Sequence, residues 1–581
     1  MILQRLMEYE QRHTDTAPIG YAHRTVHYAI RLRSDGTFID LIPLAGVESK
    51  TGKSGQSMLV PSGKRSGTSP PAFLLIDDAR YVIGISGFDD YHQRFVALVK
   101  KCAEATHHPM VCAVAKWLEA GESLPKESSG LLTQTDVIGF EVDGHWTTDL
   151  PEVRDFWAEI SNSSTASRAG GAKARCLITG KLEEPVRILP FKIKGVPNTN
   201  QGQADFTSFN EPSFRSFGLE QTQNSPMSQE AARLFVNGLN RLLRDPLTRL
   251  YVQDAVYCFW SRHPCDFDIL TYLEDPTPES VAELLRSATM GHRVEANDTG
   301  PRTADYFVLA LSGNRSRIVV RDYHETTLDA VKANLVRWFE QLAIIGPDGG
   351  DAKPPGIFRL AASLFREAKD MPAHVPTALL NAAVNGAPLP DYLLGLAVRR
   401  NLAMQGPYAV YNKQRYLSVE RMAIIKALLC KGKEIDLKGL NPEHPDAAYH
   451  CGRLLAVLDS VYVHFINSDK PKGAKWTRPK STVSARYYGS ASASPASVYG
   501  ALIHGSRAHL TKLRGSDKDF GYELKLEEIC QSIGTEFPKT LDMRRQGIFA
   551  LGYYHQTASD RAARELHGVK VEDIEEEGDE A

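Results

Sequence analysis

The apolar pattern of this chain changes once, near residue 328, and no other feature limits the possible folds as strongly. Before that point apolar residues alternate or run together between turn residues, as at 25–33 and 37–44 on either side of Ser34-Asp35-Gly36. This pattern predicts a β-hairpin, since alternate side chains of a strand face opposite sides of a sheet. After residue 328 the strand pattern stops and apolar residues recur at helical spacing.

Further elements follow from the same two periodicities. Two more strand pairs are predicted, at residues 73–76 with 80–85 and at 306–311 with 317–322. Helices are predicted at residues 90–106, 110–120 and 228–244, the last with Ser228 as its N-cap. The later helices are 328–342, 357–368, 389–404, 418–430, 447–466, 495–514, 523–533, 538–551 and 559–567. Strands followed by a run of helices predict an α+β fold, in which a mixed N-terminal body with long basic loops precedes an all-helical C-terminal bundle.

The length of 581 residues suggests several domains. The predicted division is 1–165 and 166–345, both α+β, then a helical connector at 346–445, the helical bundle at 446–570 and an acidic disordered tail at 571–581. No run of eighteen apolar residues is present to span a membrane. The eight cysteines form no C-x-x-C pair, which indicates free thiols in a reducing, cytoplasmic setting, and no cofactor is expected.

Charge is segregated along the chain, although the totals balance at 68 basic and 70 acidic residues. Residues 470–516 contain no Asp or Glu, and such a surface suits a polyanion because each Lys or Arg beside a phosphate releases a condensed counterion. A solvated loop with a basic helix behind it is the alternative. Three aromatic residues in this segment could stack on bases: Trp476, Tyr487 and Tyr488. The predicted backbone contacts here are Lys470, Lys472, Lys475, Arg478, Lys480, Arg486, Arg507, Lys512 and Arg514.

Three other basic segments also lack carboxylates, namely residues 49–76, 161–182 and 185–204. Four such segments in one chain favour nucleic-acid contact over four unrelated solvated loops. Further backbone contacts are predicted in the segments 49–76 and 161–182 and near the C-terminus. They are Lys50, Lys53, Lys64, Arg65, Arg168, Lys173, Arg175, Arg544 and Arg545.

Matches to nucleotide-binding and kinase motifs are weak. Residues 46–54 have Val47 where a phosphate-binding loop needs its first glycine. Asp519-Phe520-Gly521 stands without the glycine-rich loop and the catalytic loop of a kinase.

Metal chemistry has little support, so no metal site and no enzymatic activity are predicted. Ligands for a metal nuclease usually converge from separate strands, whereas the candidates here share one loop and helix start. A metal-dependent nuclease remains the alternative function, and its residues would be Asp517, Asp519, Glu523 and Lys525. The spacing of the one group of possible zinc ligands is unusual, and these are Cys102, His107, His108 and Cys112.

A series of motifs between residues 176 and 243 goes beyond composition. They are Cys-Leu-x-Thr-Gly at 176–180, Ile-Lys-Gly-Val at 193–196, Ser-Phe-Asn at 208–210, Gln-x-x-Asn-x-Pro at 221–226 and Leu-Asn-x-Leu-Leu at 239–243. This series resembles the central signature of the large subunit of the type I-C CRISPR Cascade complex. The start MILQRLMEYEQR and the C-terminal Arg486-Tyr487-Tyr488 and Leu551-Gly552-Tyr553-Tyr554-His555 are similar too, so the resemblance covers nearly the whole chain.

The resemblance implies a non-enzymatic subunit of an RNA-guided DNA-surveillance complex. Such a subunit recognises the protospacer-adjacent motif in duplex DNA, opens the duplex, holds the displaced strand and recruits a helicase-nuclease. Its implied partners are the guide RNA, the target DNA, the handle-binding and backbone subunits, and a small subunit translated from an internal start. The logic of such systems is that base pairing reads the sequence while protein reads a short duplex motif.

Residue roles within that function are inferred from chemistry. Residues 192–203 combine lysines with amides, which can contact base edges, so we predict that this loop reads or wedges the DNA motif. Packing of the loop on a neighbouring subunit is the alternative, and a general RNA-binding scaffold is the alternative for the whole chain. The six predicted residues of the loop are Lys192, Lys194, Asn198, Asn200, Gln201 and Gln203.

Overall fold

The computed structural model divides the chain into two compact units. Unit 1 contains Met1–Pro246 and Leu311–Arg321, and unit 2 contains Leu247–Ala310 and Asp322–Ala581. The structure describes residues 2–13, 18, 20–44, 55–63, 65, 70–84, 87–121, 124–125, 132–166, 173–186, 189, 192–209, 211–215, 217–291, 305–403, 418–430, 437–471, 476–479, 481–516, 519–566 and 574–576.

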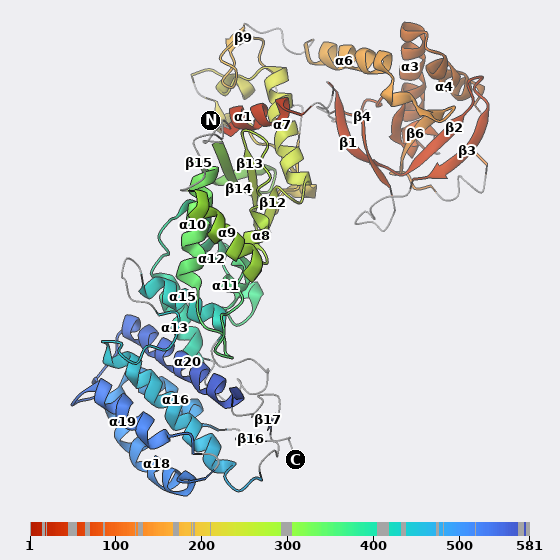
Figure 1. The fold of residues 1–581 in the computed structure, drawn as a ribbon. Coiled ribbons are helices and arrows are strands. Elements are labelled where there is room, and N and C mark those ends of the chain that lie inside the picture. The colour runs from red at the N-terminus through yellow and green to blue at the C-terminus, as the bar shows by residue number, and fades with distance from the viewer. Residues whose placement is uncertain are drawn as a thin grey trace. The chain divides into compact units, whose positions relative to one another are not determined.

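The first part of unit 1 is a mixed sheet with the strand order β3-β2-β6-β5. Its strands are β2 (Tyr28–Leu32), β3 (Phe38–Pro43), β5 (Ile76–Asp78) and β6 (Val137–Val142), with β7 (His145–Trp146) paired to β6. Only β2 and β6 run parallel, because helices α3 (Asp89–Thr106) and α4 (Pro109–Ala120) lie between them in the chain. The two helices lie beside the sheet (Figure 1). Phe95, Trp117 and Phe140 join them to it in one buried core.

A separate antiparallel ribbon of β1 (Tyr21–Val26) and β4 (Gln56–Pro61) belongs to the same part of unit 1. Helix α6 (Pro151–Ala166) packs against α3, and the Trp157 indole donates a hydrogen bond to the Gly20 carbonyl at 2.7 Å. This bond fixes the chain at the start of β1.

The second part of unit 1 is built on two crossed helices, α1 (Ile2–Gln11) and α7 (Gln229–Arg244). Ser228 caps α7 by accepting a hydrogen bond from the Ala231 amide at 3.3 Å. A Cβ at Gly238 would lie 2.3 Å from the Leu6 carbonyl oxygen, so glycine permits the close crossing that Figure 1 shows. The short strands beside α7 are β8 (Ala174–Arg175), β9 (Leu182–Glu183), β10 (Ile193–Lys194) and β11 (Gln203–Ala204).

Unit 2 begins with a four-stranded sheet in the order β12-β13-β14-β15. Its strands are β12 (Arg249–Val252), β13 (Ala255–Ser261), β14 (Asp305–Asn314) and β15 (Arg317–Thr327), and the turn of the β14–β15 hairpin belongs to unit 1. The helices that follow share one continuous apolar core with this sheet. They are α8 (Leu270–Leu273), α9 (Pro278–Gly291), α10 (Leu328–Leu342), α11 (Ile357–Ala362), α12 (His374–Asn385), α13 (Tyr392–Ala403) and α15 (Val419–Leu429).

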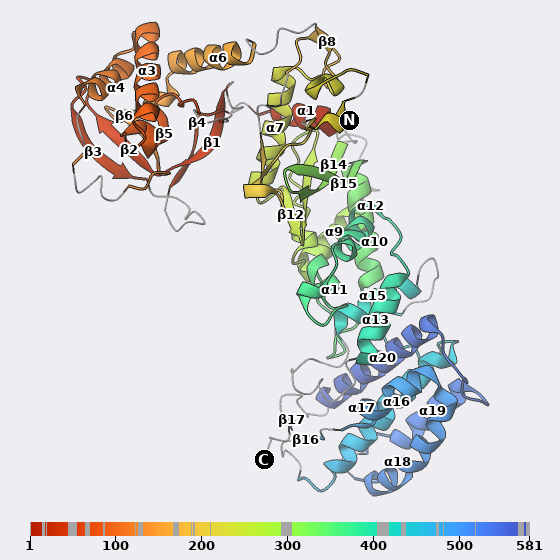
Figure 2. The same ribbon diagram turned by 180° about the vertical axis from the view of Figure 1, so that it is seen from behind.

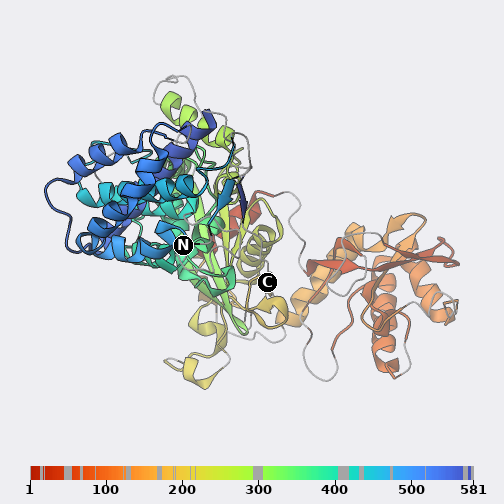
Figure 3. The ribbon, with the colours of Figure 1, turned by 90° about the horizontal axis from the view of Figure 1, so that it is seen from below.

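The C-terminal bundle surrounds one central helix, α16 (Ala447–Ile466), as the blue helices in Figures 2 and 3 show. The longest neighbour, α20 (Met543–Leu566), meets α16 with backbone against backbone. A Cβ at Gly452 would lie 2.0 Å from the Phe549 carbonyl oxygen, and one at Gly552 would lie 2.0 Å from that of Tyr449. The remaining helices of the bundle are α17 (Val483–Ala493), α18 (Tyr499–Leu513) and α19 (Tyr522–Ile533).

The α+β prediction is confirmed, as are the hairpins at β2–β3 and β14–β15. The strand pair at residues 73–85 is wrong, because β5 pairs with the distant β6 while Ala79–Val82 forms the short helix α2. The separate helices at 538–551 and 559–567 are also wrong. They form the single helix α20, in which Gly552 serves close packing on α16 rather than a break. Helices α6, α9, α12 and α17 are absent from the sequence-based expectations.

Candidate nucleic-acid interface

The predicted motif loop is held against the turn of the β14–β15 hairpin by main-chain hydrogen bonds. Gly313 donates to the Pro197 carbonyl at 2.8 Å, and the Asn200 amide donates to the Arg315 carbonyl at 2.8 Å. Farther along, the Asp205 amide donates to the Ser316 carbonyl at 3.0 Å. These bonds convert residues 192–205 from an isolated loop into a supported ledge, which we call the motif ledge.

Two backbone features set the course of this ledge. A Cβ at Gly313 would lie 2.3 Å from the Pro197 carbonyl oxygen, so only glycine allows the hairpin to approach so closely. Asn198 has a φ of +58°, a left-handed conformation that asparagine tolerates better than most residues. Its side chain stands exposed at this bend.

The exposed side chains of the motif ledge are chiefly amides. Asn198, Asn200 and Gln203 are exposed, while the side chain of Gln201 lies outside the described part of the structure. Arg315, at the hairpin turn, is exposed and has no carboxylate partner among the described residues. The structure thus adds a cation to the ledge that sequence reasoning missed, although a basic residue in a predicted turn was a usable indication.

The two lysines of the ledge differ. Lys192 pairs with Asp205 at 2.6 Å, so its charge is compensated locally. The amide of Lys194 donates to Asn240 Oδ1 at 2.9 Å, and Asn240 Nδ2 donates to the Lys192 carbonyl at 3.0 Å. Asn240 therefore clamps β10 to α7 and leaves the Lys194 ammonium without a carboxylate partner among the described residues.

Lys194 borders a cleft of about 860 Å³ within unit 1. Its walls come from the β1–β4 ribbon, from β10 and β11, and from the C-terminal half of α7. Glu10 is the one carboxylate residue among the lining residues, and it is bound to Arg241 at 2.9 Å. The cationic lining residues are Arg24, Arg65, Lys192, Lys194, Arg241 and Arg244.

The electrostatics of the cleft reflect crowded positive charge. Lys194 is exposed by surface area, but desolvation by the surrounding protein lowers its pKa, and repulsion from Arg24 lowers it further. Burial likewise lowers the pKa of Arg24, and neighbouring Arg65 adds to this effect while Asp77 opposes it. An anion in the cleft would relieve both shifts.

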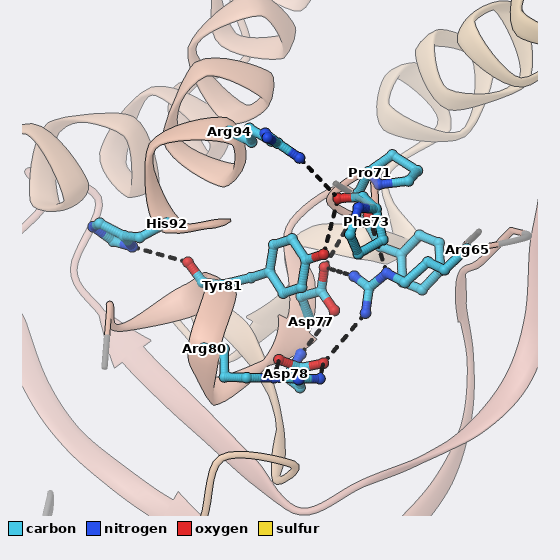
Figure 4. A network of polar contacts seen from close by, with 10 residues as sticks. Arg65, Pro71, Phe73, Asp77, Asp78, Arg80, Tyr81, His92 and Arg94 are labelled. Atoms are coloured by element: carbon cyan, nitrogen blue, oxygen red, sulfur yellow. Dashed lines mark hydrogen bonds and ion pairs between the residues drawn. The ribbon is translucent and has the colours of Figure 1, made fainter. Parts of the chain in front are cut away.

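Arg65 was predicted to contact a phosphate backbone, but the structure gives it partners inside the domain. Its guanidinium pairs with the buried carboxylates of Asp77 and Asp78 and lies between two aromatic rings, 4.1 Å from that of Phe73 and 4.2 Å from that of Tyr81 (Figure 4). Its charge is therefore largely compensated. We assign Arg65 the role of joining the segment that precedes β5 to the carboxylates of β5 itself.

In the helical bundle, cations and aromatic rings interleave along α16, α17 and α18. The exposed Arg486 lies 5.5 Å from the ring centre of Tyr462 and 5.8 Å from that of Tyr487. Tyr487 is 38% exposed, which leaves a face available for stacking. Arg507 is exposed on α18 and has no carboxylate partner among the described residues. We call Arg486, Tyr487 and Arg507 the bundle face.

The stacking prediction for Tyr488 is wrong. Its side chain is 2% exposed and packs edge-on against Phe549 and Tyr553 in the core of the bundle. Adjacent residues of a helix point about 100° apart, so one tyrosine faces solvent and the next faces α20.

Several other predicted cations of the bundle have partners in their own unit. Lys512 pairs with Asp469 at 2.8 Å and Arg545 pairs with Asp446 at 2.8 Å. Arg514 pairs with Glu523 at 2.5 Å, and Arg544 donates to the Leu429 carbonyl at 2.8 Å. The pairs of Lys512 and Arg514 are exposed and therefore weak, so these two cations can exchange their carboxylates for phosphates.

The remaining predicted backbone and stacking residues lie at short strands, at the end of α16 or outside the described part of the structure. Lys173 and Arg175 are exposed at β8, where Arg175 donates to the Gly180 carbonyl at 3.1 Å, and Lys470 follows α16. Trp476 and Arg478 lie in β16 (Trp476–Arg478), which pairs in parallel with β17 (Ile574–Glu576) of the acidic tail. The predicted residues outside the described part of the structure are Lys50, Lys53, Lys64, Arg168, Lys472, Lys475 and Lys480.

The residues of the alternative nuclease site have structural partners. Both carboxylate oxygens of Asp519 accept main-chain hydrogen bonds, from Gly515 and Gly521, and Lys525 pairs with Asp560 at 2.9 Å. Glu523 binds Arg514, and Asp517 lies outside the described residues. Among the described residues, no group of His, Cys, Asp and Glu is arranged to hold a metal ion. No observation therefore favours a nuclease site here.

The possible zinc ligands are likewise explained by helix structure. Burial raises the pKa of Cys102 to about 12, which disfavours the thiolate that zinc requires. His107 ends α3 in a left-handed conformation, and His108 caps α4 by accepting from the Met110 amide at 3.3 Å.

Comparison with known families identifies the chain. Among the described residues, no helix combines the length and apolar character needed to cross a membrane. No curated protein matches the chain. The family model of a CRISPR-associated protein (Cas_Csd1) matches residues 3–560, and this match confirms the CRISPR association that the central motifs predicted. The chain therefore belongs to the Cas_Csd1 family of CRISPR-associated proteins and is a protein of the Cascade type.

Proposed function

We propose that this chain is the large subunit of a type I-C Cascade complex, and that it acts in the cytoplasm by recognising a short motif in duplex DNA next to the guide-paired sequence. It opens the duplex there, holds the displaced strand and presents a surface to a helicase-nuclease, without breaking bonds itself. The family membership supports the setting, and the motif ledge supports the assignment of motif recognition.

The observation that carries the proposal is the supported row of amides on the motif ledge. Asn and Gln side chains donate and accept at base edges, and specificity requires that they be held in place. Hydrogen bonds from the hairpin turn hold the backbone on both sides of Asn198 and Asn200. Exposed Arg315 beside them provides a phosphate contact that would fix the ledge on the duplex.

The bundle face fits a different part of the same task. Arg486 and Arg507 offer charges for a flexible backbone, and Tyr487 offers a ring for unpaired bases. Such mixed surfaces bind single strands with little sequence preference. We propose that the displaced DNA strand follows this face.

A selection experiment tests the motif assignment. The assembled complex is incubated with duplexes whose positions flanking the guide-paired sequence are randomised, and the bound DNA is sequenced. The wild-type complex is expected to enrich one short motif, and the double change Asn198→Ala with Asn200→Ala is expected to flatten that enrichment, since a lost bidentate contact costs about 1–3 kcal/mol of discrimination.

The control for this selection is Gln531→Ala, an exposed amide on α19 that the proposal does not use. It should leave the enriched motif unchanged. If the double variant keeps the wild-type enrichment but lowers the yield of assembled complex, the ledge is a subunit contact and the proposed role is wrong.

A further inference from the structure

Two donors that lie buried in the cleft of unit 1 have no acceptor. Arg24 Nη1 and Asn237 Nδ2 are both shielded from solvent, and neither has a hydrogen-bond partner among the described residues. Both residues line the same cleft, Arg24 from β1 and Asn237 from α7. Buried donors are paired in the great majority of cases, so two orphans on residues that line one cleft call for an acceptor.

The charges around these donors indicate what the acceptor is. Arg24, Lys194 and Arg244 line the cleft without a carboxylate partner among the described residues, whereas Lys192 and Arg241 are paired with Asp205 and Glu10. The single carboxylate residue in the lining is thus already engaged. A cavity with surplus cations and unused N–H donors is complementary to an anion that presents several oxygen atoms.

The geometry of a guanidinium narrows the choice further. The guanidinium carbon of Arg24 lies over the Phe73 ring, 5.1 Å from its centre, and a guanidinium in contact with a ring through its face keeps its N–H edge for a planar or tetrahedral oxyanion. The cleft has a volume of about 860 Å³, far more than one phosphate needs, and it extends along β10 and β11 to Gln203 of the motif ledge. A cleft of this size can hold a phosphate together with the sugars on either side of it in a polynucleotide.

We propose that this cleft seats one phosphodiester group of a nucleic-acid backbone, with Arg24 and Asn237 donating to its oxygen atoms and Lys194 neutralising its charge. The inference rests on the proposed function, since it takes the phosphate from a nucleic acid that the motif ledge also contacts. It adds Arg24 and Asn237, which no motif of the sequence indicates, to Lys194 of the predicted loop.

The stability of the unbound chain gives a readout that separates a ligand site from a structural one. A buried guanidinium nitrogen without an acceptor costs stability, so replacing Arg24 with an apolar side chain of similar length should stabilise the unbound chain. Arg24→Met in the full-length chain is therefore expected to raise the thermal midpoint by about 2–4 °C. A residue that merely held the fold together would give a decrease.

Binding is measured in parallel by fluorescence anisotropy over a range of salt concentrations. The probes are a labelled 24-base-pair DNA duplex and a labelled single-stranded RNA of the guide-handle sequence. Arg24→Met and Lys194→Gln are each expected to weaken binding about tenfold and to reduce the slope of log affinity against log salt by about 0.9 for the duplex or about 0.7 for the single strand. The probe that shows this loss identifies the source of the phosphate.

The matched control is Arg33→Met, an exposed arginine on the same part of unit 1 that lies outside the cleft lining. It should change neither the thermal midpoint nor the salt slope of the anchored phosphate. If Arg24→Met and Lys194→Gln bind both probes with wild-type affinity and slope, the seat is refuted. If Arg24→Met lowers the midpoint, Lys194→Gln alone decides, because its exposed side chain can be changed without disturbing the core.

The outcome is distinguishable from failure of the proposed function. A wild-type complex that enriches no DNA motif contradicts the proposed function, whatever the slopes are. Loss of one phosphate contact in the two variants, with the motif enrichment intact, supports the seat as an anchor that is separate from motif reading. Loss of motif enrichment without a change in slope contradicts it.

Discussion

Tyr487 and Tyr488 are adjacent in the sequence but have different environments in the structure. The first is 38% exposed beside Arg486, and the second is 2% exposed among Phe549 and Tyr553. We expect Tyr488→Ala to destabilise the helical bundle by about 3–5 kcal/mol, because a large buried ring is removed. Tyr487→Ala should change stability by about 0.5 kcal/mol or less and should instead weaken the binding of single-stranded DNA.

Urea unfolding followed by circular dichroism measures the stability of the two tyrosine variants, and anisotropy with a labelled oligonucleotide measures their binding. Loss of stability in both variants, or a binding loss confined to Tyr488→Ala, would contradict the assignment of Tyr487 to the bundle face.

At the same scale, charge pattern alone predicts where cations occur but not which of them are already paired. Arg65 and Arg545 belong to basic runs in the sequence, yet Asp77 and Asp446 bind them from elsewhere in the fold. Arg24 was missed for the opposite reason, since a single arginine in an alternating strand has no distinctive sequence context. Ion pairing between distant segments depends on tertiary structure, which periodicity does not contain.

Elements were predictable where local periodicity decides them. The hairpin of β14 and β15 and the capped helix α7 follow from spacing and from Ser228. The pairing of β5 with β6 does not, because helices α2, α3 and α4 separate these strands in the chain. The contact of the hairpin turn with the motif ledge could not be predicted either. In the sequence Gly313 is indistinguishable from a glycine that serves only the turn, and its close approach to Pro197 appears only in the fold.

Gly313 provides the test at the scale of elements. Gly313→Ala places a methyl group against the Pro197 carbonyl and should push the hairpin turn away from the motif ledge, at a cost of about 1–3 kcal/mol. Limited proteolysis is expected to show faster cleavage within residues 197–205. The control is Gly505→Ala in α18, where the space is open, and there alanine should stabilise the helix by about 0.5–1 kcal/mol. Unchanged cleavage in Gly313→Ala would show that the ledge does not depend on the hairpin.

Two histidines are held neutral by the fold, His444 just before α16 and His450 in its first turn. His450 Nε2 donates to the His444 carbonyl at 2.6 Å, and His450 Nδ1 accepts from Arg453 at 3.2 Å, so both ring nitrogens are used by the neutral form. Burial lowers the pKa of His444 and of His450. The unfolded chain therefore binds protons more readily than the folded one, and stability falls as the pH drops below about 6.5.

The histidine prediction concerns the urea midpoint of unfolding between pH 7.5 and 5. The midpoint should fall toward acid pH in the wild type, and this dependence should be weaker in His450→Gln. His145→Gln, at an exposed position, serves as the control and should retain the wild-type dependence. A wild-type midpoint that is level or rises toward pH 5 would contradict neutral burial of these rings.

For the whole molecule, the sequence resemblance predicted a CRISPR-associated protein and the pattern of strands and helices predicted the α+β class; the family match agrees with the first and the structure with the second. The motif ledge and the cleft were only partly predicted. Their lysines and amides lie in one acid-free segment, but Arg315, Arg24 and Asn237 come from a hairpin, a ribbon and a helix far away in the chain. A surface built from several segments becomes visible only when the chain is folded.

Photo-cross-linking of the assembled complex to its target duplex tests the central claim most directly. Thio-substituted thymidines are placed at each position of the DNA that flanks the guide-paired sequence, and cross-linked peptides are mapped by mass spectrometry. We predict cross-links to residues 192–205 and to the hairpin turn at 313–317, and their loss when the DNA lacks the enriched motif. Cross-links that avoid both segments while the complex remains bound to its target would contradict the account.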